Sequence, residues 1–157
     1  MRHLEEDLVT KLIEATPFDL PPTVVARTTR ARTEQRFQSM YMQHSYRHGN
    51  PDEAAVNAML QEATEGVGPS AERSIRTWYI VERIAKKEKL FATESDVQKK
   101  IEDMALRSKK TPTQVREQLL KDGDIDSLRM EILEQKVLDL LKEHAQIVDE
   151  ACDHHHH

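Results

Sequence analysis

The stretch "EATPFDLPPTVVART", residues 14–28, joins two helical patterns through an extended elbow. The Thr16-Pro17 step ends the first pattern, because proline disfavours helical backbone angles in the residue before it. Pro22 then suits the first turn of a new helix, which we expect to run to His48. Just beyond the elbow, residues 27–36 read "RTTRARTEQR" and contain no large apolar side chain. A helix that is polar all round is typical of a segment that bridges solvent.

The composition predicts an all-α protein. Aromatic residues make up 4% of the 157 residues, and the chain has only 4 Gly and 6 Pro. So few aromatics and turn formers argue against a β-sandwich or barrel, whereas the many Glu, Lys, Gln, Arg, Leu and Ala favour helix. The hydrophobic share of 38% is below the usual globular value, which favours an elongated molecule.

Periodicity and end signals together predict seven helices and no strand. Gly49 is expected as a C-cap, Asn50 as the next N-cap and Pro51 as the first residue of the third helix. "GVGP" at 66–69 is expected to break that helix. Thr93 and Thr111 are predicted N-caps, each followed three residues later by a side chain able to complete a capping box. The predicted helices are residues 4–16, 22–48, 51–64, 70–91, 93–105, 111–122 and 126–145.

The segment "TWYIV", residues 77–81, has high strand propensity, but strong helix formers flank it on both sides. Its length and the absence of a breaker favour one long helix. Trp78 and Tyr79 are therefore interpreted as core residues.

Charge and cysteine content limit the setting of the protein. The net charge of −5 gives no general case for nucleic acid. The lone Cys152 excludes an internal disulfide framework, and no apolar run approaches the roughly 20 residues that span a membrane. We expect a cytoplasmic protein without membrane contact. The final "HHHH", 154–157, is interpreted as a tag remnant, and the opening "MRHLEEDL" as the start of a fragment.

No common catalytic or phosphate-binding motif is present, so no enzyme and no cofactor are expected. His44 and His48 have metal-ligand spacing, but neither an H-E-x-x-H motif nor a cysteine pair accompanies them. They are interpreted as solvated histidines near a helix end, where the dipole favours cations, and no metal site is expected.

An arginine-rich stripe allows two interpretations: a phosphate-binding surface or the solvated face of a projecting helix. Glu34 is the only acidic residue among these arginines, and the stripe at 27–47 has no aromatic side chain placed to stack on a base until Tyr41. With a negative net charge, the solvated face is favoured and nucleic-acid binding is not expected. The stripe consists of Arg27, Arg30, Arg32, Arg36 and Arg47.

The stretch "FQSMYMQHSY", residues 37–46, places large apolar side chains on more than one face of its helix. Methionine is flexible and polarizable, so methionine-rich surfaces can adapt to varied apolar partners. Two interpretations stay open: packing against the helix at 51–64, or an exposed binding surface. The residues concerned are Phe37, Met40, Tyr41, Met42 and Tyr46.

Three stretches resemble the C-terminal, substrate-binding domain of bacterial trigger factor, and more loosely the chaperone domains of the SurA type. The likeness is weak over residues 33–70 and good over 71–148, and it rests on the order and spacing of elements. The three stretches are "LVTKLIEATPFDLPPTVVAR" (8–27), "AERSIRTWYIVERIAKKEKLFATESDVQKKIEDMA" (71–105) and "SLRMEILEQKVLDLLKEHAQI" (127–147).

The resemblance implies an elongated multi-helix body with two projecting helical arms in a single domain. The stretch "RTTRARTEQR" would then form the stalk of the first arm. The implied parts are the domain at 1–153, arm one at about 22–68, arm two at about 93–122, and body helices at about 71–91 and 126–148.

The resemblance also implies an ATP-independent chaperone that holds unfolded or nascent polypeptides on apolar patches. A prolyl-isomerase module is absent from the chain, and a missing N-terminal portion would make any ribosome contact. The sequence leaves open whether the chain forms a homodimer. The alternative is a helical scaffold or adaptor that binds one defined partner or itself. The expected client contacts are Phe37, Met40, Tyr41, Met42 and Tyr46 on the first arm and Met104 and Leu106 on the second.

Overall fold

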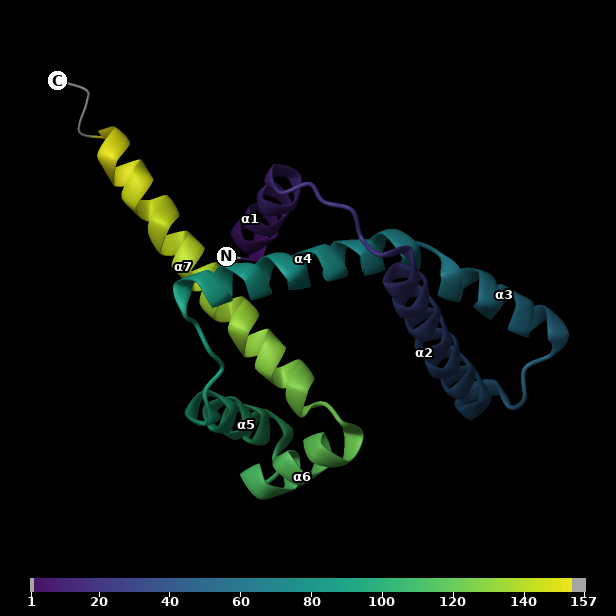
Figure 1. Cartoon of the computed structure of the whole chain (residues 1–157). Helices are drawn as coiled ribbons and strands as arrows, with labels where there is room; N and C mark the ends of the chain where they lie inside the picture. The colour runs from purple at the N-terminus through teal and green to yellow at the C-terminus, as the bar shows by residue number, and fades with distance from the viewer. Residues whose placement is uncertain (1, 154–157) are drawn as a thin grey trace. The chain divides into compact units, whose positions relative to one another are not determined.

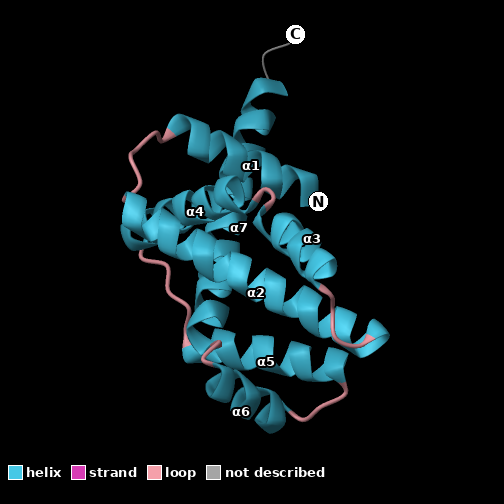
Figure 2. Ribbon diagram, turned by 90° about the vertical axis from the view of Figure 1, so that its right-hand side faces the viewer, coloured by secondary structure: helices cyan, strands magenta, loops and turns pink. Residues whose placement is uncertain are grey.

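The computed structural model describes residues 2–153, with side chains for 3–145, and this part of the chain is helical without strands (Figures 1 and 2). The all-α prediction is therefore confirmed. The expected tag remnant at 154–157 and the side chain of Cys152 lie outside the described residues. The helices are α1 (Arg2–Ala15), α2 (Pro22–His48), α3 (Glu53–Thr64), α4 (Val67–Glu88), α5 (Glu94–Ser108), α6 (Pro112–Asp122) and α7 (Ile125–Asp153).

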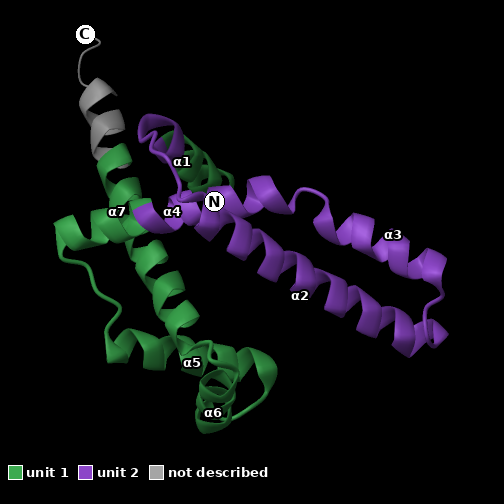
Figure 3. Ribbon diagram, turned by 45° about the vertical axis from the view of Figure 1, so that its right-hand side comes forward, with its two compact units in different colours: residues 1–11, 80–157 green, residues 12–79 purple. Residues whose placement is uncertain are grey.

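The chain divides into two compact units, coloured separately in Figure 3. Unit 1 comprises residues 1–11 and 80–157, and unit 2 comprises residues 12–79. Both boundaries fall inside helices, α1 and α4, so unit 1 is assembled from two separate stretches of the sequence.

Unit 2 is built on a hairpin of α2 and α3, which contact each other and are joined by residues 49–52 (Figure 3). Its buried residues come from α3 and the first half of α4, whereas α2 contains no fully buried residue. The polar character of α2 thus matches its partly exposed position. The buried residues are Met59, Ala63, Val67, Ala71 and Ile75.

Two arginines of the polar stretch bind backbone oxygens at the end of α3 and the start of α4. Arg36 Nη1 donates to the backbone oxygen of Glu65 over 3.0 Å, and Arg32 Nη1 donates to that of Ser70 over 3.3 Å. Glu65 follows the C-terminus of α3, where carbonyls lack helical partners, so Arg36 satisfies an oxygen that would otherwise need water. Ser70 lies in the first turn of α4, so the bond from Arg32 ties α2 to the start of that helix. The stretch "RTTRARTEQR" therefore binds neighbouring backbone through its arginines, in addition to facing solvent.

The elbow is fastened to α4 in the same way. Arg76 Nη1 donates to the backbone oxygen of Phe18, and its guanidinium lies 5.2 Å from the centre of the Phe18 ring. Tyr79 meets that ring edge-on, with centroids 6.1 Å apart and planes at 86°. Arginine is the only strongly basic residue in 12–79, since the segment contains no lysine.

Unit 1 buries two apolar clusters. In the larger one, α5 and α6 pack against the start of α7, and in the smaller one α4 packs against the middle of α7. Lys136 on α7 adds a polar link, donating over 2.6 Å to the Asp96 carboxylate and over 2.8 Å to the backbone oxygen of Phe91. The larger cluster is Val97, Ile101, Ala105, Val115, Leu128 and Ile132, and the smaller is Val81, Ala85 and Val137.

The capping predictions are confirmed at three helix ends. Thr93 and Thr111 each accept a hydrogen bond from the third residue of their helix in a complete capping box. Gly49, with φ of 81°, caps the end of α2.

The start of α3 and both ends of α4 differ from the predictions. The N-cap of α3 is Asp52, whose carboxylate accepts from Ala55 N over 2.8 Å, so the assignment to Asn50 is wrong. The break between α3 and α4 falls at the start of "GVGP", where Gly66 has φ of 69°, but it is shorter than expected because α4 already begins at Val67. Pro69 fits there, since a proline in the first helical turn forfeits no helical hydrogen bond.

At its other end α4 stops at Glu88, three residues earlier than expected. Lys89 adopts a left-handed conformation with φ of 54°, and Leu90 N donates back to the Ala85 oxygen over 2.8 Å. Trp78 is also not a core residue, because it stays 40% exposed.

Candidate functional site

The outer end of α2 carries the most exposed large apolar side chains of unit 2. Met42 is 70% exposed and Tyr46 is 94% exposed. They are four residues apart, so they lie one turn apart on the same face of the helix. Gln35, Gln38 and Ser39 belong to the same side by helical spacing, so this face carries no charge.

A hollow of about 330 Å³ adjoins this face and is lined by Phe37, Gln38, Tyr41 and Met42. The rings of Phe37 and Tyr41 lie 6.1 Å apart, and both side chains are half-buried. The hollow and the two exposed side chains form one surface, which we call the α2 patch: Phe37, Tyr41, Met42 and Tyr46.

The two interpretations of "FQSMYMQHSY" apply to different residues. Phe37, Met40 and Tyr41 are half-buried, as packing requires, whereas Met42 and Tyr46 point to solvent. Ser45 lies among the packed residues, and its hydroxyl is buried without a hydrogen-bond partner in the described part of the chain. The apolar stretch therefore both packs and leaves surface exposed.

The two expected contact residues of unit 1 are placed differently from each other. Leu106 is 80% exposed near the end of α5. Met104 is half-buried and packs against the larger core cluster. Of these two side chains, only Leu106 has most of its apolar surface exposed and available to a partner.

Three further large apolar residues of unit 1 are exposed and were not expected as contacts: Leu4, Phe91 and Leu120. Leu120 on α6 is 61% exposed, and Phe91 after α4 is 68% exposed. The spacing from Val115 to Leu119 defines the buried face of α6, so Leu120, one residue further, had to turn away from it. That signal was present in the sequence. Phe91 lies beyond the end of α4, which the sequence did not predict, so helical periodicity could not indicate that its side chain is exposed.

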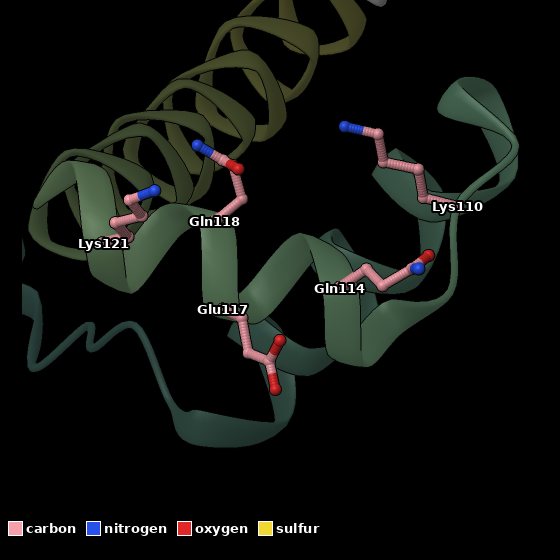
Figure 4. Close-up of a pocket in the computed structure, with 5 residues that line it drawn as sticks. All are labelled: Lys110, Gln114, Glu117, Gln118 and Lys121. Carbon is pink, nitrogen blue, oxygen red and sulfur yellow. The ribbon is translucent and has the colours of Figure 1, made fainter.

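A second hollow, of about 370 Å³, lies on α6 and is polar in character. It is lined by Lys110, Gln114, Glu117, Gln118 and Lys121. Figure 4 shows the Glu117 carboxylate pointing away from the two lysine side chains. The hollow contains no apolar side chain, so it differs in kind from the α2 patch.

Altered pKa values among the described residues arise from hydrogen bonds of charged side chains and from burial. Hydrogen bonds from Lys136 and Thr93 lower the pKa of Asp96, and one from Arg116 lowers that of Glu94. Burial raises the pKa of Glu134. Within 2–153, no three metal-ligating side chains gather into a site. None of the described helices combines the length and apolar character needed to cross a bilayer.

Comparison with known proteins places these observations in a family. A family model described as "Bacterial trigger factor protein (TF) C-terminus" matches residues 1–143. The trigger factor of Rhodopirellula baltica is 29% identical over 146 residues, which cover 93% of this chain and 29% of that protein. The trigger factor of Koribacter versatilis is 28% identical over 137 residues, covering 87% and 30%.

The trigger factor of Akkermansia muciniphila is 28% identical over 146 residues, covering 92% of this chain and 32% of that protein. The chain thus spans about a third or less of the length of these curated relatives. No solved structure shows a significant match.

Proposed function

The chain belongs to the family of the bacterial trigger factor C-terminus, and we propose that it is a molecular chaperone domain that holds unfolded or nascent polypeptides. The observation that carries the proposal is the α2 patch, where Met42 and Tyr46 stay exposed beside an apolar hollow. A folded protein rarely leaves neighbouring large apolar side chains uncovered on one helix face unless they meet a partner.

Holding is proposed to need no nucleotide, because burial of apolar surface drives it directly. Covering one side chain of the size of methionine contributes about 1.5–3 kcal/mol at most. One such contact is weak and reversible, which suits a holder that must release its client. The methionine thioether and the tyrosine ring accept apolar groups of different shapes, so no particular client sequence is required.

Leu106 and Leu120 are proposed as further contact points in unit 1. Both are isolated exposed leucines, so each alone adds little. A long unfolded client that reaches several weak sites on one chain binds more tightly than any single site allows. Met104 would contribute less, since it already packs against the core.

We further propose that the chain is not an enzyme and acts in the cytoplasm. A ribosome contact and prolyl isomerisation are assigned to parts of a longer protein outside residues 1–157. The two projecting arms, about 22–68 and 93–122, also remain a proposal, in which α2 with α3 and α5 with α6 form the arms.

The test is aggregation of several unrelated proteins diluted from denaturant, followed by light scattering without ATP. The full chain is expected to slow aggregation. Met42→Ser combined with Tyr46→Ser should weaken this effect, because both exposed apolar groups are lost while the half-buried residues of the α2 patch stay in place. Gln43→Ser, on the same turn but polar from the start, is the matched control and should behave like the unchanged chain.

Far-UV circular dichroism checks that the variants keep their helical content. If the chain fails to slow aggregation of any client while a single protein binds it tightly, the adaptor reading replaces the chaperone reading. If the chain slows aggregation only at concentrations where it forms dimers, the exposed apolar side chains act mainly in self-association, and the proposal that they bind clients fails.

A further inference from the structure

The last two turns of α2 present His44 and His48 as a pair, four residues and one helical turn apart. Their ring centroids lie 5.1 Å apart with planes tilted by 52°. His44 is half-buried and His48 is exposed, so the pair opens to solvent from one side. The proposed function does not use these residues.

The separation of the rings is the one that a shared metal ion would require. Zinc binds imidazole nitrogen at about 2.0–2.1 Å and prefers tetrahedral angles between its ligands. Each ring centre lies about 1 Å behind its nitrogen, so two imidazoles on one zinc ion place their centres about 5 Å apart. The observed separation of the ring centroids matches this value.

The position at the end of α2 also favours a cation. The carboxyl end of a helix carries a partial negative charge, and α2 ends at His48. Arg47 is the only other charged residue in that last turn, and it projects roughly a quarter of a turn away from the pair by helical spacing. The helix dipole therefore favours a cation at the histidines, and the positive charge of Arg47, three residues from His44, offsets part of this attraction.

We propose that His44 and His48 form a two-ligand site for a divalent transition-metal ion, with zinc as the ion the geometry fits. No third histidine, cysteine or carboxylate of the described chain joins them, so water completes the coordination. The ion links two successive turns at the C-terminal end of α2, where the last carbonyls of a helix lack helical partners. The sequence alone favoured solvated histidines; the distance between the rings changes that interpretation.

Zinc titration by calorimetry tests the proposal on the full chain, with residues 154–157 changed to serine in every arm so that they do not compete. One ion per chain is expected to bind. His44→Ala and His48→Ala should each weaken binding by roughly tenfold or more, because a single imidazole has no chelate advantage. His144→Ala removes an exposed histidine of α7 and should leave binding unchanged.

A spacing control separates chelation from histidine content. The double variant Gln43→His with His44→Gln keeps the composition but moves the two imidazoles about 140° apart around the helix. It should bind zinc as weakly as the single variants while keeping the same helical content. Full affinity in this variant, or no zinc binding by the unchanged chain, would overturn the proposal.

Discussion

Single side chains can hold a helix in place by hydrogen bonds when it has few apolar residues to bury. In unit 2 this is done by Arg32, Arg36 and Arg76. The three guanidinium groups donate to backbone oxygens just after α3, in the first turn of α4 and in the elbow. The planar guanidinium carries five donors on a long stem, so it can reach such an oxygen and keep its charge in water. Lysine offers a compact ammonium group with no such fork. An all-polar stretch can therefore stabilise a fold through its donors.

Asp96 is the residue from which we expect a measurable pH dependence of stability. Its carboxylate accepts from Lys136 Nζ and from the backbone N and hydroxyl of Thr93, and these hydrogen bonds hold its pKa well below the ordinary value. A carboxyl group with a lowered pKa in the folded state contributes stability above its unfolded pKa of about 3.9, and this is lost as pH falls further. Asp96→Asn should lower the free energy of unfolding at pH 7.

The difference between Asp96→Asn and the unchanged chain should shrink as pH falls from about 4 towards about 2. Urea unfolding at a series of pH values measures it. Asp103→Asn, an exposed aspartate on the same helix, should show little effect at any pH. If Asp96→Asn lowers the free energy of unfolding by the same amount at low pH as at pH 7, the hydrogen bonds of the ionised carboxylate are not the cause of the destabilisation.

The candidate site was predictable as a stretch but not as a set of exposed atoms. Large apolar residues concentrated at 37–46 marked the α2 patch from the sequence. Which of them stay exposed depends on where α3 lies against α2, and periodicity within one helix cannot reveal that. Met42 and Tyr46 turn out exposed, whereas Met104 packs on a core built from three helices.

At the scale of helices, ends were predictable where the signal is a local side-chain hydrogen bond. Thr93 and Thr111 cap their helices because each finds its partner three residues on, within one short stretch. The end of α4 was missed because a lysine, not a glycine, takes the left-handed position. Asn50 and Asp52 are both good caps, and the choice between them depended on how the loop crosses from α2 to α3.

Lys89 and Lys109 both follow a helix with positive φ, at 54° and 55°. A left-handed conformation costs a residue with a Cβ roughly 1–2 kcal/mol, whereas glycine adopts it without this steric cost. Glycine also loses more conformational entropy on folding, and this cancels part of the stabilisation. Lys89→Gly and Lys109→Gly should therefore each raise the free energy of unfolding by about 0.5–1 kcal/mol. Urea unfolding followed by circular dichroism measures the change.

Lys86→Gly is the control for these two variants. Lys86 lies in the last turn of α4, still within the helix, where glycine is unfavourable by up to about 1 kcal/mol, so its replacement should destabilise the protein. If all three glycine variants destabilise, the left-handed lysines are not strained and the explanation for the helix ends fails.

At the scale of the whole molecule, the division into units does not follow the order of the sequence. Unit 1 joins the first residues of α1 to everything after residue 79, and α4 belongs partly to each unit. Periodicity identifies helices but not which of them pack together, so the sequence could predict seven helices without predicting this division. Nor do local signals decide whether helices project as arms.

Small-angle scattering tests the proposed arms. A compact chain of 157 residues should have a radius of gyration of about 15 Å. A monomer with two projecting arms should exceed this value clearly. Molar mass from light scattering must accompany the measurement, because a compact dimer would also be larger. A monomer at about 15 Å would contradict the arms.

The use of arginine as the only strong base in unit 2 has a practical consequence. Lys11 and Lys86 are consecutive lysines in the sequence. A protease that cleaves only after lysine therefore releases residues 12–86 as one peptide, which contains the whole of unit 2. Reagents that couple to primary amines, such as common cross-linkers and fluorescent esters, will mark unit 1 and leave the α2 patch chemically untouched.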